Sequence, residues 1–376
     1  MISNKNVCAL VIIAGSLNAC GGGGDSGTST PVAVTPTSPA VVTPATPVVA
    51  IPTTPTAPVV VDPDIPLSLP AAPVAVVPTA PATSTSNLQT TVPTPTYAVG
   101  SAELTFFNTL NDFRSKLGLG LLAQNAKLDK ASSNHLVYVL ANLDLNMLAL
   151  DANGSPVFHS EDPSRTGYTG ITPADRVRVT QYAATYVGEE GGFGVPGTAL
   201  ANLIATVYHR NGLMLQTPRD IGLAFGGSAT QTYVIEEGYE STAQSNAADF
   251  FGSYPADKQT GVPLSMAVES PTPFIDITYA DYASKTSFPI NVVSEASTTL
   301  VVNSFSVTQA GATTPLSVYQ LNSSTSAQDK RYLGKNTAFI VGKVAFRPNT
   351  TYNVSFSGTV NGTTVNKNWS FTTTAL

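Results

Sequence analysis

The spacing of apolar residues changes along the chain and divides it into zones. Residues 20–99 are mostly Pro, Thr, Val and Ala, with no Lys or Arg. Their apolar residues follow neither the 3.6-residue period of a helix nor the alternation of a strand. Proline also removes backbone hydrogen-bond donors, so we expect a disordered, Pro/Thr-rich tether. The alternative to a plain spacer is a glycosylated stalk.

From residue 100 to 245 the pattern predicts helices and strands together. One helix is indicated by apolar residues three or four positions apart, namely Phe106, Leu110, Phe113 and Leu117, with Gly118 as its stop. A second stripe contains Leu128, Ala131, His135 and Val139. We interpret His135 as a packed, hydrogen-bonded core residue, with a ligand role as the alternative. A third helix over 198–214 is expected to end near His209.

Two segments of this zone have strand character, "DIGLAF" and "QTYVIEEGY". The stretch "YVGEEGGFGVPG" between the second and third helices is predicted to be a glycine-rich loop. No Lys-Ser/Thr follows its glycines, which argues against a phosphate-binding loop. The zone therefore reads as a mixed α and β layered domain.

The C-terminal zone, 288–376, shows strand patterns alone. Its clearest feature is a hairpin in which apolar residues alternate on both sides of the turn Asn361-Gly362. Further strands at regular spacing indicate a β-sandwich, and the zone resembles a bacterial immunoglobulin-like domain. Residues 246–287 contain strand fragments and several prolines, and we treat them as a connecting segment.

The first twenty residues have the pattern of an export signal. The apolar run Val7 to Leu17 is too short to cross a bilayer as a helix, which favours a signal peptide over residues 1–19. The sequence Leu-Asn-Ala-Cys ending at Cys20 resembles a bacterial lipobox, in which the cysteine carries the lipid. A plain secretory signal or an unprocessed anchor are the alternatives. Cys8 would leave with the signal, so the mature chain would have no thiol nucleophile and no disulfide.

Charge narrows the possible partners. The chain has 18 Lys and Arg against 24 Asp and Glu, and loss of Lys5 with the signal leaves 18 − 1 = 17 basic residues. An acidic balance argues against nucleic acid, whose phosphates require basic patches. Membrane attachment is therefore expected through the lipid on Cys20. Gly21, where some inner-membrane lipoproteins have aspartate, favours the outer membrane.

Several short motifs then recur in one order. The segment "VFHSEDP" holds His159 and Glu161, and the chain contains only three histidines. The motifs are Asn111, Arg114, Gly118 and Leu119 in the first helix, Phe158-His159, Asp175-Arg176, Gly188-Glu189-Glu190, and His209-Arg210. In this order they resemble the CAP (SCP) superfamily, named for cysteine-rich secretory, antigen 5 and pathogenesis-related proteins, over roughly residues 100–240.

The resemblance implies an α+β chain with a CAP-type α/β/α sandwich, followed by the all-β immunoglobulin-like sandwich. It also implies a cleft in which two histidines and two glutamates can hold a divalent metal such as zinc. Matched one by one, the ligands would be His159, Glu161, Glu189 and His209, with Glu161 the weakest match. Such a set leaves one coordination position open for water or a ligand. A metal-free hydrogen-bonded cluster of the same residues is the alternative.

The chain also departs from the family pattern. Glu190 stands where the motif has asparagine, so it could compete with Glu189 or face solvent. No Ser-His-Asp, Gly-x-Ser-x-Gly or His-Glu-x-x-His signature is present. We therefore expect a lipid-anchored cell-envelope binding protein that is not an enzyme, with a lipid, glycan or protein ligand. A metal-assisted hydrolase acting on peptide or cell-wall substrates is the alternative, and a passive surface protein is a third.

Overall fold

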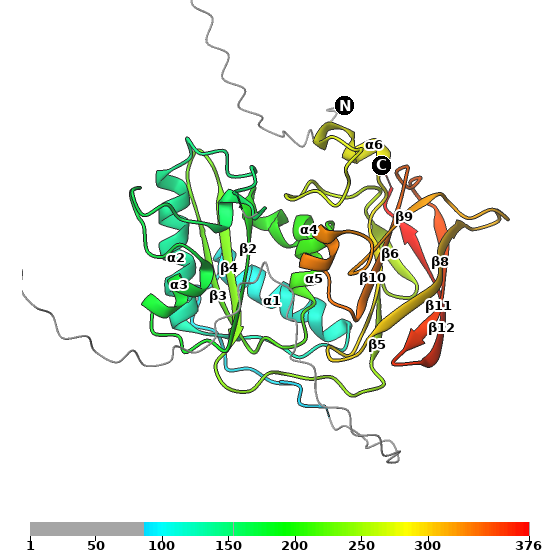
Figure 1. The fold of residues 1–376 in the computed structure, drawn as a ribbon, viewed down its shortest axis with the longest axis horizontal. Coiled ribbons are helices and arrows are strands. Elements are labelled where there is room, and N and C mark those ends of the chain that lie inside the picture. Colours follow the sequence, from blue (N-terminus) through cyan, green and yellow to red (C-terminus); the bar gives the residue numbers. More distant parts are fainter. Residues whose placement is uncertain (1–85, 153, 376) are drawn as a thin grey trace, which may run out of the picture. The chain divides into compact units, whose positions relative to one another are not determined.

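The computed structural model describes residues 86–152 and 154–375. The predicted signal peptide, Cys20 and the tether up to residue 85 lie outside the described residues. The described residues belong to one compact unit with helices and several sheets, which confirms the α+β class (Figure 1). Among them, no helix combines the length and apolar character that crossing a bilayer requires.

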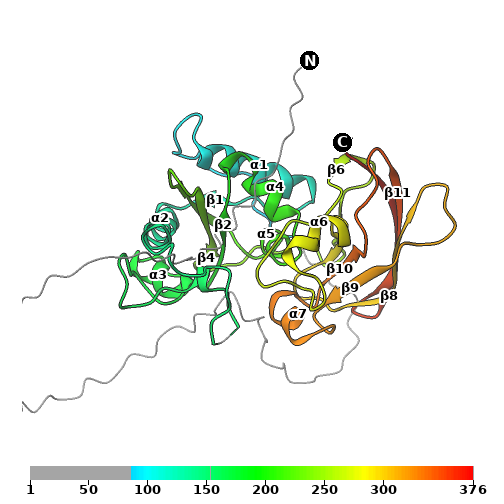
Figure 2. The ribbon, with the colours of Figure 1, turned by 90° about the horizontal axis from the view of Figure 1, so that it is seen from above.

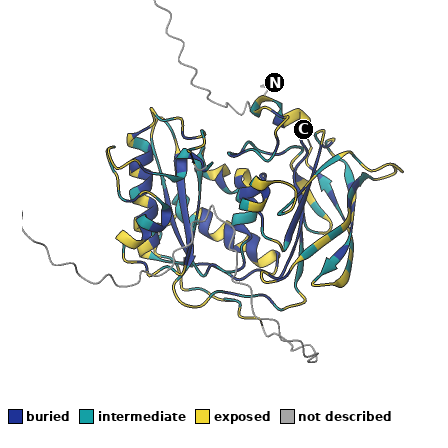
Figure 3. Ribbon diagram, in the orientation of Figure 1, coloured by how far each residue is buried: buried dark blue, intermediate teal, exposed yellow. Residues whose placement is uncertain are grey.

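The N-terminal half is built on a four-stranded sheet, here called the first sheet. Its order is β1-β3-β4-β2, with β1 parallel to β3 and the other pairs antiparallel. The strands are β1 Ala123–Gln124, β2 Tyr186–Phe193, β3 Asp220–Gly226 and β4 Thr232–Tyr239. β4 is buried along nearly its whole length (Figure 3). It therefore places side chains into the interior on both faces of the sheet.

Helices cover both faces of the first sheet. They are α1 Ala102–Lys116, α2 Ala126–Ala141, α3 Pro173–Val179, α4 Ala199–Ile204 and α5 Tyr208–Leu213, with the 3₁₀ turns η1 Val157–His159 and η2 Pro196–Thr198. Figure 2 shows α2 and α3 on one side and α1, α4 and α5 on the other. Successive side chains of β4 point to opposite faces of the sheet, in agreement with these two helical layers. Val234 packs in the apolar cluster that contains α2 residues, and Ile235 packs in the cluster that contains α1 residues.

The first two predicted helices are confirmed. α1 starts at Ser101, whose hydroxyl accepts a hydrogen bond from the Leu104 amide, and ends before Gly118 at φ +72°. The third helix was predicted as one piece and is two. Thr206 lies in the break, where its hydroxyl donates to the carbonyl of Leu203. His209 therefore lies in the first turn of α5 and does not end a longer helix.

The predicted glycine-rich loop was wrong for residues 186–193, which form β2. Glu189 of β2 lies opposite Glu236 of β4 in continuous antiparallel register. The glycines belong to the strand because neighbours approach the backbone closely. A Cβ on Gly191 would lie 2.2 Å from the Phe158 ring. From the sequence alone, such closely spaced glycines predict a loop.

The C-terminal half consists of two four-stranded sheets, of order β5-β7-β10-β9 and β6-β12-β11-β8. The strands are β5 Phe251–Tyr254, β6 Gln259–Val262, β7 Ile290–Ser294, β8 Leu300–Gln309, β9 Val318–Asn322, β10 Thr337–Gly342, β11 Thr351–Val360 and β12 Thr363–Thr373; the short helices are η3 Tyr279–Asp281, α6 Tyr282–Lys285 and α7 Ala327–Tyr332. Both sheets contribute to one apolar cluster, in which Phe251 of β5 contacts Phe356 of β11.

Two sequence predictions bear on this half. The hairpin at Asn361-Gly362 is confirmed, with both turn residues at positive φ and β11 paired along β12. The segment 246–287, treated as a connector, supplies β5 to one sheet and β6 to the other. The sheet pair therefore begins before residue 288.

The last part of the predicted tether is held against the domain. The Gln89 amide donates to Gln244 Oε1 at 2.6 Å, and the Leu121 amide donates to the Gln89 carbonyl at 2.7 Å. Further along, the Tyr97 hydroxyl donates to Asp129 at 2.6 Å. The disordered tether was thus predicted too long at its C-terminal end, because side-chain hydrogen bonds across long sequence separations leave no periodic pattern in the sequence.

Candidate functional site: a buried histidine, glutamate and arginine cluster

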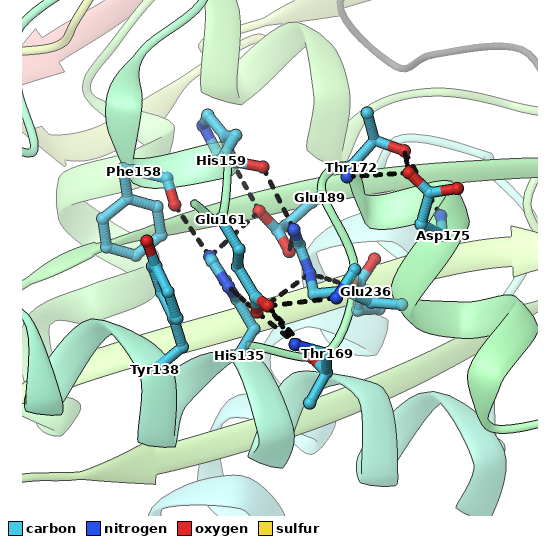
Figure 4. Close-up of polar contacts among 12 residues, drawn as sticks. His135, Tyr138, Phe158, His159, Glu161, Thr169, Thr172, Asp175, Glu189 and Glu236 are labelled. Atoms are coloured by element: carbon cyan, nitrogen blue, oxygen red, sulfur yellow. Dashed lines mark hydrogen bonds and ion pairs between the residues drawn. The ribbon is translucent and has the colours of Figure 1, made fainter. Parts of the chain in front are cut away.

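Six ionisable side chains gather between α2, α3 and the first sheet, and we call them the polar cluster (Figure 4). They are His135 from α2, His159 from η1, Glu161 from the loop after it, Arg176 from α3, Glu189 from β2 and Glu236 from β4. Their side chains are fully buried, except that 12% of the His159 side chain is exposed. Three of the four predicted ligands lie in it.

His135 is held between two acceptors. Its Nδ1 lies 2.9 Å from Glu161 Oε1 and its Nε2 lies 2.7 Å from the carbonyl oxygen of Phe158. A carbonyl oxygen can only accept, so Nε2 carries a proton. The pair with Glu161 then holds one further proton between Nδ1 and the carboxyl group. The prediction that His135 is a hydrogen-bonded core residue is confirmed, and neither ring nitrogen has a lone pair left for a metal.

Glu161 is also fully engaged. Besides His135, its carboxylate accepts hydrogen bonds from the backbone amides of Thr169 and Gly170, the latter at 3.1 Å. The Thr169 hydroxyl approaches both carboxylate oxygens at 3.2 and 3.3 Å. Glu161 therefore ties the loop of residues 161–170 to α2.

A second group within the polar cluster joins His159, Glu189 and Arg176. His159 Nδ1 lies 2.8 Å from Glu189 Oε1, and Arg176 Nη2 donates to Glu189 Oε2. Arg176 Nη1 also donates to the His159 carbonyl at 3.2 Å. With Nδ1 as the donor to a carboxylate, the lone pair of a neutral His159 lies on Nε2. The carboxylate thus fixes the tautomer of the partly exposed histidine.

The two carboxyl groups on neighbouring strands have pKa values shifted in opposite directions. Burial would raise the pKa of Glu189, but the charges of Arg176 and the two histidines outweigh it and the pKa lies well below its ordinary value. Burial, followed by the nearby charge of Glu189, raises the pKa of Glu236 well above its ordinary value. The environment therefore favours the charged form of Glu189 and the neutral form of Glu236.

Arg176 completes the balance of charge. Its Nε lies 3.9 Å from one oxygen of Glu161 and 3.9 Å from one oxygen of Glu236. Burial opposes its charge, but Glu189 and Glu236 outweigh burial and the pKa of Arg176 is raised. Neither oxygen of Glu236 has a hydrogen-bond partner among the described residues. Arg176 is thus the permanent cation that the surrounding carboxylates share.

His209, the fourth predicted ligand, contacts a different pair of carboxylates. Its Nδ1 lies 3.3 Å from Glu269 Oε2, and its Nε2 lies 3.9 Å from Glu190 Oε2. Glu269 also accepts the amides of Val207 and Tyr208, each at 2.9 Å. Glu190, for which solvent exposure or competition with Glu189 had been considered, faces His209 with 15% of its side chain exposed.

A further acid lies on the opposite face of the first sheet. Glu237 follows Glu236 in β4 and is buried, and burial raises its pKa to about 7 although Arg114 of α1 opposes the shift. Arg114 is fully buried and donates to the carbonyls of Gly120 and Leu213, both at 2.8 Å. The adjacent residues Glu236 and Glu237 thus place one weakened acid on each face.

The side chains of the polar cluster are committed to one another. Each oxygen of Glu161 and of Glu189 already accepts an internal hydrogen bond, and both ring nitrogens of His135 are engaged. Arg176 already supplies the positive charge. Across residues 86–152 and 154–375, no group of three or more His, Cys, Asp or Glu side chains is placed to hold a metal ion.

Two acidic residues near the candidate site were not predicted from the sequence. Glu236 was read only as part of a strand, although a pair of acids inside the apolar run "YVIEEGY" is a signal of buried charge. Glu269 lies in the segment treated as a connector, and no local pattern relates it to His209. Arg176 had been matched to a family motif without a role.

Comparisons with known proteins show limited likeness. No protein-family model matches the chain, and no curated protein matches it. Among solved structures, an outer surface protein of Borrelia burgdorferi is 14% identical with a TM-score of 0.31, covering 39% of this chain and 97% of its own. An extracellular protein with an SCP domain from Bacillus anthracis is 18% identical with a TM-score of 0.28, covering 36% and 39%. Likenesses at this level do not assign the chain to a family.

Proposed function

We propose that this chain is an exported, envelope-associated binding protein that performs no catalytic turnover. Residues 100–245 serve as a CAP-type binding domain, with the C-terminal sheet pair as an immunoglobulin-like partner. The lipid on Cys20 attaches the chain to a membrane, the outer one by the identity of Gly21. The polar cluster serves as an internal brace that fixes the shape of the domain.

The observation that carries this proposal is the position of Arg176 among three carboxyl groups. A buried cation and anion in direct contact lose hydration on folding, and removal of one leaves the other uncompensated. Glu189 is therefore held in the folded state by Arg176 at one oxygen and by His159 at the other. A group held in this way supports structure better than it supports chemistry.

A second candidate, the metal-assisted hydrolase, rests on His159. Its Nδ1 is oriented by a carboxylate and its ring is partly exposed, an arrangement that suits a metal ligand or a general base at Nε2. Zinc would be the expected metal, with His209 as a further ligand. In this reading Glu189 or Glu161 would act as a ligand or base in addition to its internal hydrogen bonds.

Metal analysis of the purified full-length chain separates the two candidates. If the polar cluster is only a brace, the zinc content after zinc loading and gel filtration should be far below one ion per chain. The same low content is expected for the His159→Ala/His209→Ala variant. About one zinc per wild-type chain, lost in the double variant, would favour the hydrolase. A screen of peptide and cell-wall digests is expected to show identical profiles for wild type and variant, whereas cleavage by wild type alone would contradict the binding role.

The anchor has its own test. Cys20→Ser is expected to move the chain from the membrane fraction to the soluble fraction, because one lipid-bearing residue supplies the attachment. Cys8→Ser is the matched control and should stay with the membrane. Retention of Cys20→Ser in the membrane would show that the attachment does not depend on this cysteine.

A further inference from the structure

The outer face of one C-terminal sheet is hollowed into a polar groove of about 400 Å³. It lies over β8, β11 and β12, which are neighbours in the sheet (Figure 1). The lining side chains are mainly hydroxyl and amide groups: Ser306, Thr308, Asn353, Ser355, Asn368 and Ser370, with Asp257 at the rim. A volume of this size falls within the roughly 300–1,000 Å³ range of small-ligand sites.

The strand register arranges these side chains in rows across the sheet. Asn353 of β11 lies opposite Thr308 of β8 and Ser370 of β12. Two residues along, Ser355 lies opposite Ser306 and Asn368. Because strand residues alternate between faces, all six point outward while Val354 and Trp369 between them belong to the buried side. The groove therefore presents two regular rows of uncharged hydrogen-bonding groups.

The turn between β5 and β6 forms the wall of the groove. Asp257 Oδ1 accepts the Ser370 amide at 3.1 Å, and the Lys258 amide donates to the Ser370 carbonyl at 2.6 Å. Lys258 has φ +61°, a left-handed conformation that a lysine rarely adopts. These contacts fix the turn against β12 and place one carboxylate beside the rows of amides and hydroxyls.

The groups in the groove are available for a ligand. The side-chain amide groups of Asn353 and Asn368 make no hydrogen bond to another described residue, and both side chains are exposed. Serine and asparagine are also poor strand formers, so sheet stability does not explain their choice at these positions. Departures from local propensity of this kind are expected where a surface has a role beyond folding.

We propose that this groove binds a neutral, hydroxyl-rich ligand, an uncharged oligosaccharide. Amide and hydroxyl side chains both donate and accept, as sugar hydroxyls do, and a carboxylate at the rim accepts from two neighbouring hydroxyls. The lining contains no Lys or Arg to recognise phosphate or sulfate. The apolar part of its lining comes from Val354 and Trp369, between the polar rows. The site lies on the C-terminal sheet pair and is independent of the polar cluster.

Calorimetric titration of the purified full-length chain tests the proposal. The probes are cellohexaose, chitohexaose and laminarihexaose, with a sulfated heparin hexasaccharide as the anionic comparison. At least one neutral probe is expected to bind with a Kd of about 1 mM or lower. Asn353→Ala/Asn368→Ala should weaken it by about tenfold or more, since two hydrogen-bonding groups are lost.

The matched control is Asn366→Ala, which removes the same amide from the same strand outside the groove lining. Its Kd is expected to stay within about twofold, because an exposed substitution away from the contact has little effect. Three results would overturn the proposal: no binding of any neutral probe, binding of heparin alone, or equal affinities for wild type and the Asn353→Ala/Asn368→Ala variant.

Discussion

Glu189 and Glu236 lie directly opposite each other on β2 and β4, inside the protein, and their pKa values are shifted in opposite directions. Two ionised carboxylates side by side in a buried site would repel strongly. Arg176 reduces this repulsion by pairing with Glu189, while the raised pKa of Glu236 favours its neutral form. The polar cluster is thus a balanced set, and each member depends on the protonation state of the others.

The first prediction concerns the buried cation of this set. Arg176→Gln should lower the free energy of unfolding by about 3–5 kcal/mol, because it leaves the buried Glu189 charge without its partner. The control is Arg165→Gln, which breaks the exposed pair with Asp144 and should lower stability far less, because solvent screens an exposed ion pair. Urea denaturation followed by circular dichroism measures both. Equal losses in the two variants would contradict the role given to Arg176.

The second prediction concerns the pH dependence of stability. The pKa of Glu237 is raised from 4.5 to about 7 in the folded state, so the folded protein binds a proton that the unfolded chain has released between these values. Stability is therefore full below the unfolded pKa and falls as pH rises through the folded one. Glu237→Gln keeps the neutral form at every pH. Its free energy of unfolding should therefore rise by about 3 kcal/mol relative to that of wild type as the pH increases from about 4 to about 8.

The measurement for Glu237 is the difference in unfolding free energy between variant and wild type across this pH range. Taking the difference cancels other titrating groups, including Glu236, whose pKa is shifted in the same direction. A flat difference for Glu237→Gln would show that burial of this acid has no cost.

The third prediction concerns the close approach at β2. Gly191→Ala should lower the free energy of unfolding by about 1–3 kcal/mol. Its Cβ would overlap the ring of Phe158, which precedes His159, and would force that ring to move. Gly197→Ala is the matched control, since a Cβ there meets no atom within 4 Å. Thermal unfolding of both variants decides the point. A Gly191→Ala variant as stable as Gly197→Ala would argue against tight packing at this position.

The fourth prediction concerns the start of α5. Glu269→Gln should speed amide exchange at Val207 and Tyr208, because a neutral amide cannot accept from both N–H groups as a carboxylate does. Hydrogen–deuterium exchange of peptides over 205–214 measures this, and peptides over α1 provide the internal control. Unchanged exchange at 205–214 would show that the start of α5 is held by other contacts.

What could be predicted from the sequence follows from how local the determinants are. α1, α2 and the final hairpin rest on apolar periodicity and on the turn residues Asn361-Gly362, which act within a few residues of chain. β2 depends on Phe158, some thirty residues away, lying against Gly191. The division of the third helix depends on Glu269, about sixty residues further on. Neither contact has a signature in the local sequence.

The candidate site shows the same limit. His159 and Glu189 were selected through the resemblance to the CAP motifs and do meet. Glu161 was selected for the same set but turns to His135, and His209 turns to Glu269, because the choice of partner depends on three-dimensional distances that sequence order does not encode. The arginine that neutralises the carboxylates decides the chemistry of the cluster, yet a charged residue in a helix gives no sign of burial.

The contacts of Asn87 and Gln89 determine where a mechanical load enters the protein. Tension arriving along the chain from its N-terminal side would meet the bond of Asn87 to Ser245 and then those between Gln89, Gln244 and Leu121. The side chain of Gln244 is buried and also holds the carbonyls of Leu121 and Pro218. These bonds share the force with the segment that leads into the C-terminal sheets. Pulling would therefore strain this junction before it reaches α1, and the polar cluster would keep its geometry under drag.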